Sequence, residues 1–324
     1  MQHRLLSLCT SALFIALTAS SHAQQPYPAR PIRMLVPFAP GGGTDISARV
    51  IGQKMTEQLH QTIIVDNRTG ASGHIAMEIA ARAAPDGYTL IMSTVAPMAF
   101  SPALFTNLTF DPLKDYAPVA LASSTVFAIV VPPGLPAKSV KELIALAKSQ
   151  PGKLSYASGG TGGASHIATE LFQLMAGTSM VHVPYKGGGA AMPEVMSGQV
   201  SLLFADVIGA RGFVAASKLR ALGVTSKVRS KMMPDVPTIA EAGLAGYEMT
   251  SWNGVLAPSG TPRVVVDRLN SVIVRVLPIP DVAERLAGDG SEFGKNTPEQ
   301  FGAFVKAEYQ KWGKIIRLAK IRIE

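Results

Sequence analysis

In the N-terminal part of the chain, short apolar runs typical of strands alternate with segments whose apolar residues recur at helical spacing. Residues 32–36 form a short, mostly apolar run, which is the pattern of a buried strand. Similar runs follow at residues 62–65 and 88–92, with a helix-spaced segment at 75–84 between them. Apolar residues at helical spacing also follow the first run: Ile46, Val50, Ile51, Met55 and Leu59. This β–α–β–α–β order predicts a parallel sheet covered by helices.

The same order returns in the middle of the chain. Strands are predicted at residues 153–157, 180–184 and 200–205, and a helix at 166–176. Each half of the chain thus carries two strand–glycine turn–helix units. The apolar face of the helix at 166–176 is expected to consist of Ile167, Leu171, Leu174 and Met175.

Two segments connect these halves. Residues 119–131 form a long apolar stretch, which we expect to cross between domains. Ser139, with Glu142 three positions later, forms a capping box that predicts a helix over 140–148.

The C-terminal part is predicted to complete the first domain. Residues 220–224 are expected to form a strand that returns to it, and residues 252–257 one more strand. Thr261 and Thr297 each precede a proline, which is the pattern of an N-cap followed by proline in the first helical position. The two closing helices should then pack onto the first domain.

Length and composition indicate two packed domains. The chain is 47% hydrophobic and 16% charged, as in a folded globular protein. About 300 residues beyond a leader exceed what one core usually serves. We expect a discontinuous first domain at 24–122 and 224–324, and a second domain at 123–223.

The first 23 residues have the pattern of a secretory signal peptide. A short basic start precedes an apolar stretch, and small residues before Gln24 suit cleavage there. We therefore expect an exported, periplasmic protein. The only cysteine, Cys9, lies in this leader, which excludes a disulfide framework or a thiol nucleophile in the mature chain.

The net charge of +8 does not indicate nucleic-acid binding. Lysines and arginines are spread along the chain, without the aromatic interleaving or the modules of nucleic-acid binders. The histidines are not paired with carboxylates at metal-ligand spacing, so no metal site is expected. No complete phosphate-loop or dinucleotide motif occurs, and we expect no cofactor.

The glycine-rich turns carry the candidate chemistry. Gly41, Gly42 and Gly43 lie between the first strand and the first helix, and Thr44 is a plausible N-cap. Helix N-termini favour anions through free N–H groups and the helix dipole. Ligands of parallel α/β sheets bind beyond the carboxyl ends of strands. Four such turns, two in each half, therefore predict a clamp for a small anion.

Several ordered motifs together resemble one known family. They lie at residues 27–33, 36–45, 67–73, 84–90, 182–187 and 234–238. The family is that of the tripartite tricarboxylate transporter solute receptors, also called the Bug family. The resemblance implies a type II periplasmic binding-protein fold, with two α/β domains that close over a ligand cleft. It also implies a monomeric receptor, not an enzyme, that delivers a small organic carboxylate to membrane transporter subunits.

The resemblance also implies which residues bind the ligand. The first glycine loop would hold a carboxylate, largely through backbone amides, with Pro40, Gly41, Gly42, Gly43, Thr44 and Asp45. The same domain would add Ser72, Gly73, His74, Ser93 and Thr94. The second domain would contribute Ser158, Gly159, Thr161, Gly162, Ser165, Tyr185, Lys186, Gly187 and Asp206.

Four of these side chains have a second interpretation. His74 either donates to the ligand or caps its helix, and the family usually has asparagine at this position. Asp206 either accepts from the ligand or holds the opposing loop amides. Lys186 either adds a positive charge or is solvated. Tyr185 either forms a cleft wall, which we expect, or acts as a catalytic acid.

Two other functions stay open at the sequence level. A receptor of this kind could serve as a ligand sensor for a membrane-bound signalling kinase. A secreted hydrolase is the enzyme alternative, but its G-x-S-x-G motif fails around Ser72 because His74 replaces the last glycine. The sequence leaves the identity of the carboxylate open.

Overall fold

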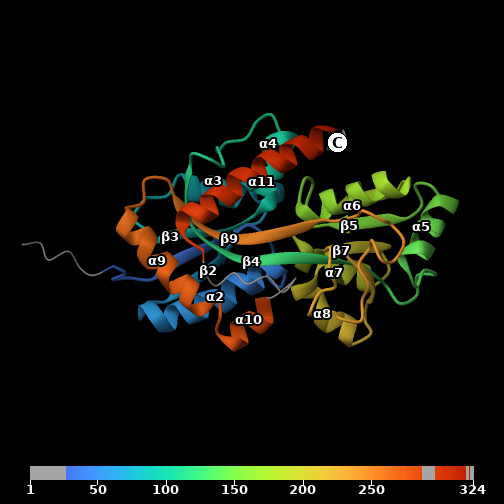
Figure 1. The fold of residues 1–324 in the computed structure, drawn as a ribbon, viewed down its shortest axis with the longest axis horizontal. Coiled ribbons are helices and arrows are strands. Elements are labelled where there is room, and N and C mark those ends of the chain that lie inside the picture. The colour runs from blue at the N-terminus through green and yellow to red at the C-terminus, as the bar shows by residue number, and fades with distance from the viewer. Residues whose placement is uncertain (1–26, 287–295, 319–320, 322–324) are drawn as a thin grey trace, which may run out of the picture.

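The longest strand, β4 (Tyr116–Val131), runs through both halves of the molecule (Figure 1). The computed structural model describes residues 27–286, 296–318 and 321, so the predicted leader and its cleavage site lie outside the described residues. β4 pairs with β9 (Thr250–Pro258) as far as Val126. From Phe127 onward it pairs with β7 (Leu202–Asp206) instead. We call the half that holds β1, β2 and β3 the first lobe, and the half that holds β5 to β8 the second lobe.

The two lobes have corresponding parallel strands. In the first lobe, β1 (Ile32–Val36) lies between β2 (Ile63–Asn67) and β3 (Thr89–Thr94) and is parallel to both. In the second lobe, β5 (Ser155–Ser158) lies in the same way between β6 (Val181–Pro184) and β7. The predicted parallel α/β order is thereby confirmed in both halves.

Helices cover both faces of each lobe. The helical elements of the first lobe are η1 (Ala71–Gly73), η2 (Ala96–Phe100), α2 (Gly43–Leu59), α3 (His74–Ala81), α4 (Ser101–Leu104), α9 (Arg263–Val276), α10 (Pro280–Leu286) and α11 (Pro298–Leu318). Those of the second lobe are α5 (Val140–Ser149), α6 (Ala164–Ala176), α7 (Gly188–Met196) and α8 (Val207–Ala215). Sequence patterns missed η2, α4, α8 and α10.

Three hydrophobic clusters hold these layers together. One lies between α2, α9 and the first-lobe strands and includes Met34, Ile51 and Leu269. Another lies under α7 and α8. The largest extends through both lobes, from Leu35 to Phe172. Apolar packing therefore continues across the crossing strands and does not stop at the boundary between the lobes.

Helix ends confirm some capping predictions and contradict others. Ser139 caps α5, and its Oγ accepts from the backbone N–H of Glu142 at 3.2 Å. Thr297 forms a reciprocal pair with Gln300 at the start of α11. Thr261 is not an N-cap, because its Oγ donates to the carbonyl of Pro258 at 2.7 Å. Pro262 is the N-cap of α9, and no side chain caps that helix.

Burial corrects the predicted face of α6. Its buried face includes Ile167, Ala168 and Phe172. Leu174 and Met175, which were expected to lie on the apolar face, are exposed. Helical spacing identifies a stripe of neighbouring residues, but the position of the sheet decides which stripe becomes buried.

The strand at residues 220–224 exists, but its predicted position is wrong. As β8 (Arg220–Val224) it pairs with the part of β4 between Ala128 and Val131, inside the second lobe. The chain crosses back to the first lobe through β9. The strand predicted at 252–257 is therefore the one that returns.

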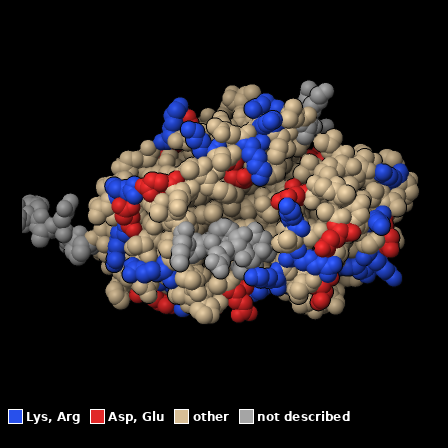
Figure 2. All heavy atoms as spheres, viewed as in Figure 1, with Lys and Arg blue, Asp and Glu red and all other residues tan. Residues whose placement is uncertain are grey.

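Basic and acidic side chains are mixed over the visible face. Figure 2 shows Lys and Arg scattered among Asp and Glu over both lobes. In the described part of the chain, no helix combines the length and the apolar composition that crossing a bilayer requires.

Candidate functional site

Three helices begin at the same cavity, and each has a glycine as its N-cap residue. The N-caps of α2, α6 and α7 are Gly42, Gly163 and Gly187, and none of these helices has a side-chain cap. All three glycines line the cavity. Because no side chain accepts a capping hydrogen bond from these helices, the N–H groups of their first turns are available to an anion.

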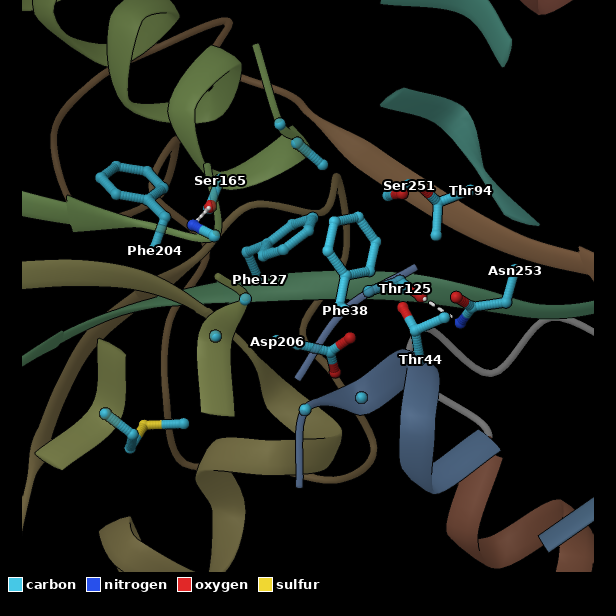
Figure 3. Close-up of a pocket in the computed structure, with 18 residues that line it drawn as sticks. Phe38, Thr44, Thr94, Thr125, Phe127, Ser165, Phe204, Asp206, Ser251 and Asn253 are labelled. Atoms are coloured by element: carbon cyan, nitrogen blue, oxygen red, sulfur yellow. Dashed lines mark hydrogen bonds between the residues drawn. The ribbon is translucent and has the colours of Figure 1, made fainter. Parts of the chain in front are cut away.

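The cavity lies between the lobes and has a volume of about 80 Å³, several times the ~10–15 Å³ that one water requires. Figure 3 shows its walls, which combine glycine backbone, aromatic rings and hydroxyl groups. The lining residues are Phe38, Gly42, Gly43, Thr44, Thr94, Thr125, Phe127, Gly159, Gly163, Ala164, Ser165, Gly187, Gly188, Met192, Phe204, Asp206, Ser251 and Asn253.

Thr44 lies inside α2 and not at its cap, so the predicted N-cap is wrong. The helix begins at Gly43 with Gly42 in an extended conformation before it. Thr44 is buried and lines the cavity as the second residue of the helix. The glycine at the cap position leaves the helix end open to the cavity.

Asp45 braces the glycine loop from behind. Its Oδ2 accepts from the backbone N–H of Gly41 at 3.0 Å, and its Oδ1 accepts from Asn67 Nδ2 at 2.9 Å. Arg49 forms an ion pair with the same carboxylate at 3.0 Å. Burial raises the pKa of Asp45, but the hydrogen bonds from Arg49, Gly41 and Asn67 outweigh burial and hold that pKa below its usual value. Asp45 does not line the cavity, and its negative charge is balanced by Arg49 within the first lobe.

Asp206 brings a carboxyl group to the opposite wall. It ends β7 and caps α8, where its Oδ1 accepts from the backbone N–H of Ile208 at 2.8 Å. In Figure 3 its side chain points toward the start of α2. Burial raises the pKa of Asp206 to about 7, although backbone hydrogen bonds from Ile208 and Gly209 lower it. The carboxyl group can therefore be protonated near neutral pH.

Side chains from the crossing strands form a neutral polar wall. Asn253 Nδ2 donates to Ser123 Oγ and to Thr125 Oγ1, both at 2.9 Å. Ser251 lines the cavity from β9, as Asn253 does. Thr94, at the end of β3, has a buried Oγ1 without a hydrogen-bond partner among the described residues. A buried hydroxyl without a partner costs free energy that a ligand group or a water can recover.

The two lobes touch across the cleft. The backbone N–H of Ala39 donates to the carbonyl of Lys186 at 2.9 Å, and Ser72 Oγ donates to the carbonyl of Thr161. A Cβ added to Gly187 would lie 2.9 Å from the Ala39 nitrogen. The lobes are thus closed on each other, and glycine is required where backbone meets backbone.

A second cavity of about 310 Å³ lies beside the first. It is lined by the turn before α3 and by the loops after β5 and β6. The fourth glycine turn therefore opens onto this neighbouring cavity, so the prediction of four helix N-termini around one cleft is corrected to three.

The predicted site residues separate into three groups. The first cavity is lined by Gly42, Gly43, Thr44, Thr94, Gly159, Ser165, Gly187 and Asp206. The second is lined by Ser72, Gly73, Gly159, Thr161, Tyr185 and Lys186. Neither cavity is lined by Pro40, Gly41, Asp45, His74, Ser93, Ser158 or Gly162.

Several members of the third group have structural partners. Ser93 Oγ donates to Met77 Sδ at 3.3 Å in the core. Ser158 Oγ lies 2.6 Å from His182 Nε2, and the backbone N–H of Gly162 donates to His166 Nδ1 at 2.9 Å. These contacts shape the loops behind the cavity wall.

His74 is turned away from the first cavity. Its Nε2 lies 2.7 Å from Ser101 Oγ, and its ring contacts Phe105 and Phe110 edge-on. Burial lowers the pKa of His74. Gly73 is the N-cap of α3, and no side chain caps the helix, so the capping interpretation of His74 is wrong.

Sequence reasoning missed many residues of the cavity wall. They are Phe38, Thr125, Phe127, Gly188, Met192, Phe204, Ser251 and Asn253, whereas Gly163 and Ala164 lie inside the predicted glycine loop at 158–165. Strand alternation offered one usable signal, because residues 125 and 127 of β4 share one face, as do 251 and 253 of β9.

Comparisons with known proteins agree on one family of receptors. Residues 47–321 match the family described as tripartite tricarboxylate transporter family receptor. Protein BugT of Bordetella pertussis is 36% identical over 315 residues, which cover 97% of this chain and 97% of BugT. Rpa4515 of R. palustris, solved with adipate, superposes with a TM-score of 0.87 at 34% identity, covering 91% of this chain and 99% of that one. MatC (Rpa3494) of Rhodopseudomonas palustris, solved with bound malate, gives a TM-score of 0.85 at 32% identity, covering 90% and 100%.

Proposed function

Because the chain belongs to the tripartite tricarboxylate transporter family receptors, we propose that it is a periplasmic receptor that captures a small organic carboxylate. The observation that carries this proposal is the meeting of three uncapped helix N-termini at one cavity between the lobes. Each N-terminus contributes roughly half a positive charge, so backbone groups alone can balance a carboxylate. Similar chains have been solved with adipate and with malate, which are both carboxylates.

The mechanism we propose is closure of the lobes around the anion. Loops of the two lobes touch through the bond from Ala39 to Lys186 and the bond from Ser72 to Thr161. A ligand that contacts both lobes binds the closed form better than the open form and shifts the population toward it. Binding and closure are then one equilibrium, and no chemical step is required of the protein.

The remaining parts of the proposal concern the export of the receptor, its oligomeric state and the delivery of its ligand. It would be exported through the leader at 1–23, with cleavage before Gln24. It would act as a monomer, release its ligand unchanged, and deliver it to membrane transporter subunits. The ligand contacts would come from those predicted site residues that line the two cavities.

We also propose that the chain passes from one domain to the other within β4 and at the start of β9. The first domain would end near Val126, where β9 pairing stops, and resume near Thr250. Residues between β8 and β9 support this assignment, since Thr225 Oγ1 accepts from the backbone N–H of Phe127 at 3.0 Å. Tyr247 likewise donates from its hydroxyl to the carbonyl of Ala168 in the second lobe at 2.8 Å. The boundary expected near residue 224 would thus move about one strand later.

A thermal-shift screen tests the proposed function. Purified protein, unfolded and refolded to remove any carried ligand, is heated with a panel of mono-, di- and tricarboxylates and with their uncharged amides. A ligand at 100 times its Kd stabilises a fold by about 2.7 kcal/mol, which is readily measured. We expect at least one acid to raise Tm while its amide does not. Equal shifts with acids and amides, or no shift with any acid, would contradict the proposal.

A further inference from the structure

We propose that the cavity selects a monocarboxylate whose body is an apolar ring and whose far end carries a neutral hydrogen-bonding group. This inference rests on the proposed function and names the ligand class of that same site. Three observations support the inference: the charge balance of the cavity, the aromatic part of its wall, and the buried Thr94 hydroxyl, which has no hydrogen-bond partner among the described residues.

The cavity can balance one ligand carboxylate and has nothing for a second. Of the described residues that line it, Asp206 alone has an ionisable acidic or basic side chain, and that side chain is acidic. Lys186 lines the neighbouring cavity, and Arg49 is paired with Asp45 behind the glycine loop. Within the described wall of the cavity, positive potential therefore comes from the three helix N-termini, each worth roughly half a charge. A second carboxylate would be buried without a counter-charge, which is costly.

Part of the wall on the second-lobe side is apolar, although Ser165 and Asp206 also line it. Phe127 of β4, Phe204 of β7 and Met192 of α7 are all buried and line the cavity. Phe38, from the loop after β1, lies beside Phe127 in the view of Figure 3 and completes this wall. A flat or compact apolar body removes more water from such a wall than a short polar acid can.

The wall on the strand-crossing side is polar but uncharged. Thr94 is 5% exposed, and its Oγ1 has no hydrogen-bond partner among the described residues. Thr125 Oγ1 accepts from Asn253 and keeps its own proton to donate. In Figure 3 these three side chains lie together, apart from Phe204. A ligand hydroxyl or carbonyl fits them, because a hydroxyl both donates and accepts.

One matched set of ligands tests this inference. Isothermal titration compares 4-hydroxybenzoate, benzoate, terephthalate, adipate and 4-hydroxybenzamide on the purified, refolded protein. We expect 4-hydroxybenzoate to bind at least ten times more tightly than terephthalate, which replaces the hydroxyl by a second carboxylate. Benzoate should lie between them, and the amide should not bind.

Variants of Thr94 test the polar end separately. Thr94→Val replaces the hydroxyl by a methyl group of similar size, and Thr94→Ser keeps the hydroxyl. We expect Thr94→Val to weaken the binding of 4-hydroxybenzoate by three- to tenfold and to leave the binding of benzoate unchanged. Thr94→Ser should bind both ligands about as tightly as the wild type does. Equal losses for both ligands would overturn the assignment of Thr94.

The outcomes separate this inference from the proposed function. Binding of adipate or terephthalate as tight as that of 4-hydroxybenzoate, without binding of the amide, would overturn the ligand class and leave a carboxylate receptor. Binding of the amide as tight as that of the acid would overturn both. If the ring acids fail to bind while an aliphatic dicarboxylate binds, the aromatic wall does not select the ligand.

Discussion

The Asp206 carboxylate packs against the α-carbon of Gly43 across the cleft. A Cβ built on Gly43 would fall closer than 3.0 Å to all three terminal atoms of the Asp206 side chain, a separation that real Cβ atoms essentially never show. The two residues belong to different lobes, since Gly43 begins α2 and Asp206 ends β7. Glycine at position 43 is therefore a condition for closure.

Gly43→Ala should weaken carboxylate binding without unfolding the protein. The added methyl group must push the Asp206 side chain or the lobes apart, and such overpacking costs about 1–3 kcal/mol. We expect a roughly 5- to 100-fold increase in Kd, by the usual conversion of tenfold per 1.4 kcal/mol. Titration calorimetry with the best ligand of the screen measures it. The Tm of the ligand-free variant should stay close to the wild type if the open form relieves the clash.

Two controls test this interpretation. Gly134→Ala adds a methyl group that meets no atom within 4 Å and should leave Kd unchanged. In the Asp206→Ala background, Gly43→Ala should raise Kd much less, because the carboxyl atoms that the added methyl group would meet are absent. Equal costs in both backgrounds would show that the clash is elsewhere.

The stability of the protein should fall as Asp206 ionises. Burial raises the pKa of this carboxyl group to about 7, whereas an unfolded chain has it near 3.8. Between these values the folded state keeps a proton that the unfolded state releases, so raising the pH favours unfolding. The stability gained from protonation is complete below pH 3.8 and is lost as pH rises through about 7.

Asp206→Asn should remove this pH dependence and keep the cap of α8, since Asn is as good an N-cap as Asp. One proton corresponds to at most about 1.4 kcal/mol per pH unit. Urea denaturation of both proteins at pH 4.5, 6.0 and 7.5 should therefore show the variant gaining relative stability with pH. Parallel profiles would mean that the carboxyl group is already ionised at pH 4.5.

Ser72→Ala should weaken ligand binding through loss of one bond between the lobes. Ser72 Oγ donates to the carbonyl of Thr161, so this bond joins the two lobes and separation of the lobes would break it. A net hydrogen bond contributes about 0.5–1.5 kcal/mol, which predicts a roughly 2- to 12-fold increase in Kd. Ser149→Ala is the matched control, because its hydroxyl bonds to Leu146 inside one helix. An effect of equal size in the control would argue against a role in closure.

Ser139→Ala should destabilise the second lobe. Its Oγ caps α5 by accepting from the backbone N–H of Glu142. Removing such a cap costs about 1 kcal/mol, within a range of roughly 0.5–2 kcal/mol. Chemical denaturation measures this loss, and Ser139→Asp should avoid it because Asp also caps. Destabilisation by Asp as large as that by Ala would mean that the cap contributes little.

Most elements could be predicted because their signals are local. The apolar run of β1 and the helical spacing of α2 each appear within one stretch of chain, and both were located correctly. Short helices that follow a strand directly, such as η2 and α8, were missed because no run of turn residues separates the pattern of the strand from that of the helix.

The site was predictable only in part, for a different reason. Gly42, Gly163 and Gly187 lie in turns that the sequence marks as glycine-rich, so the helix starts were expected. Phe127 and Asn253 reach the cavity because β4 and β9 cross between the lobes side by side. These residues are far apart in sequence, and no local pattern indicates that they face the same space.

By itself the sequence determined the strands, most of the helices, the glycine turns and the family, because all of these depend on local spacing or ordered motifs. Only the tertiary structure decided which face of α6 is buried, which lobe takes β8, and that Gly43 meets Asp206. Local spacing sets backbone conformation through interactions among near neighbours. Contacts between distant residues depend on how complete lobes pack, and the cavity with its aromatic and polar walls is a product of that packing.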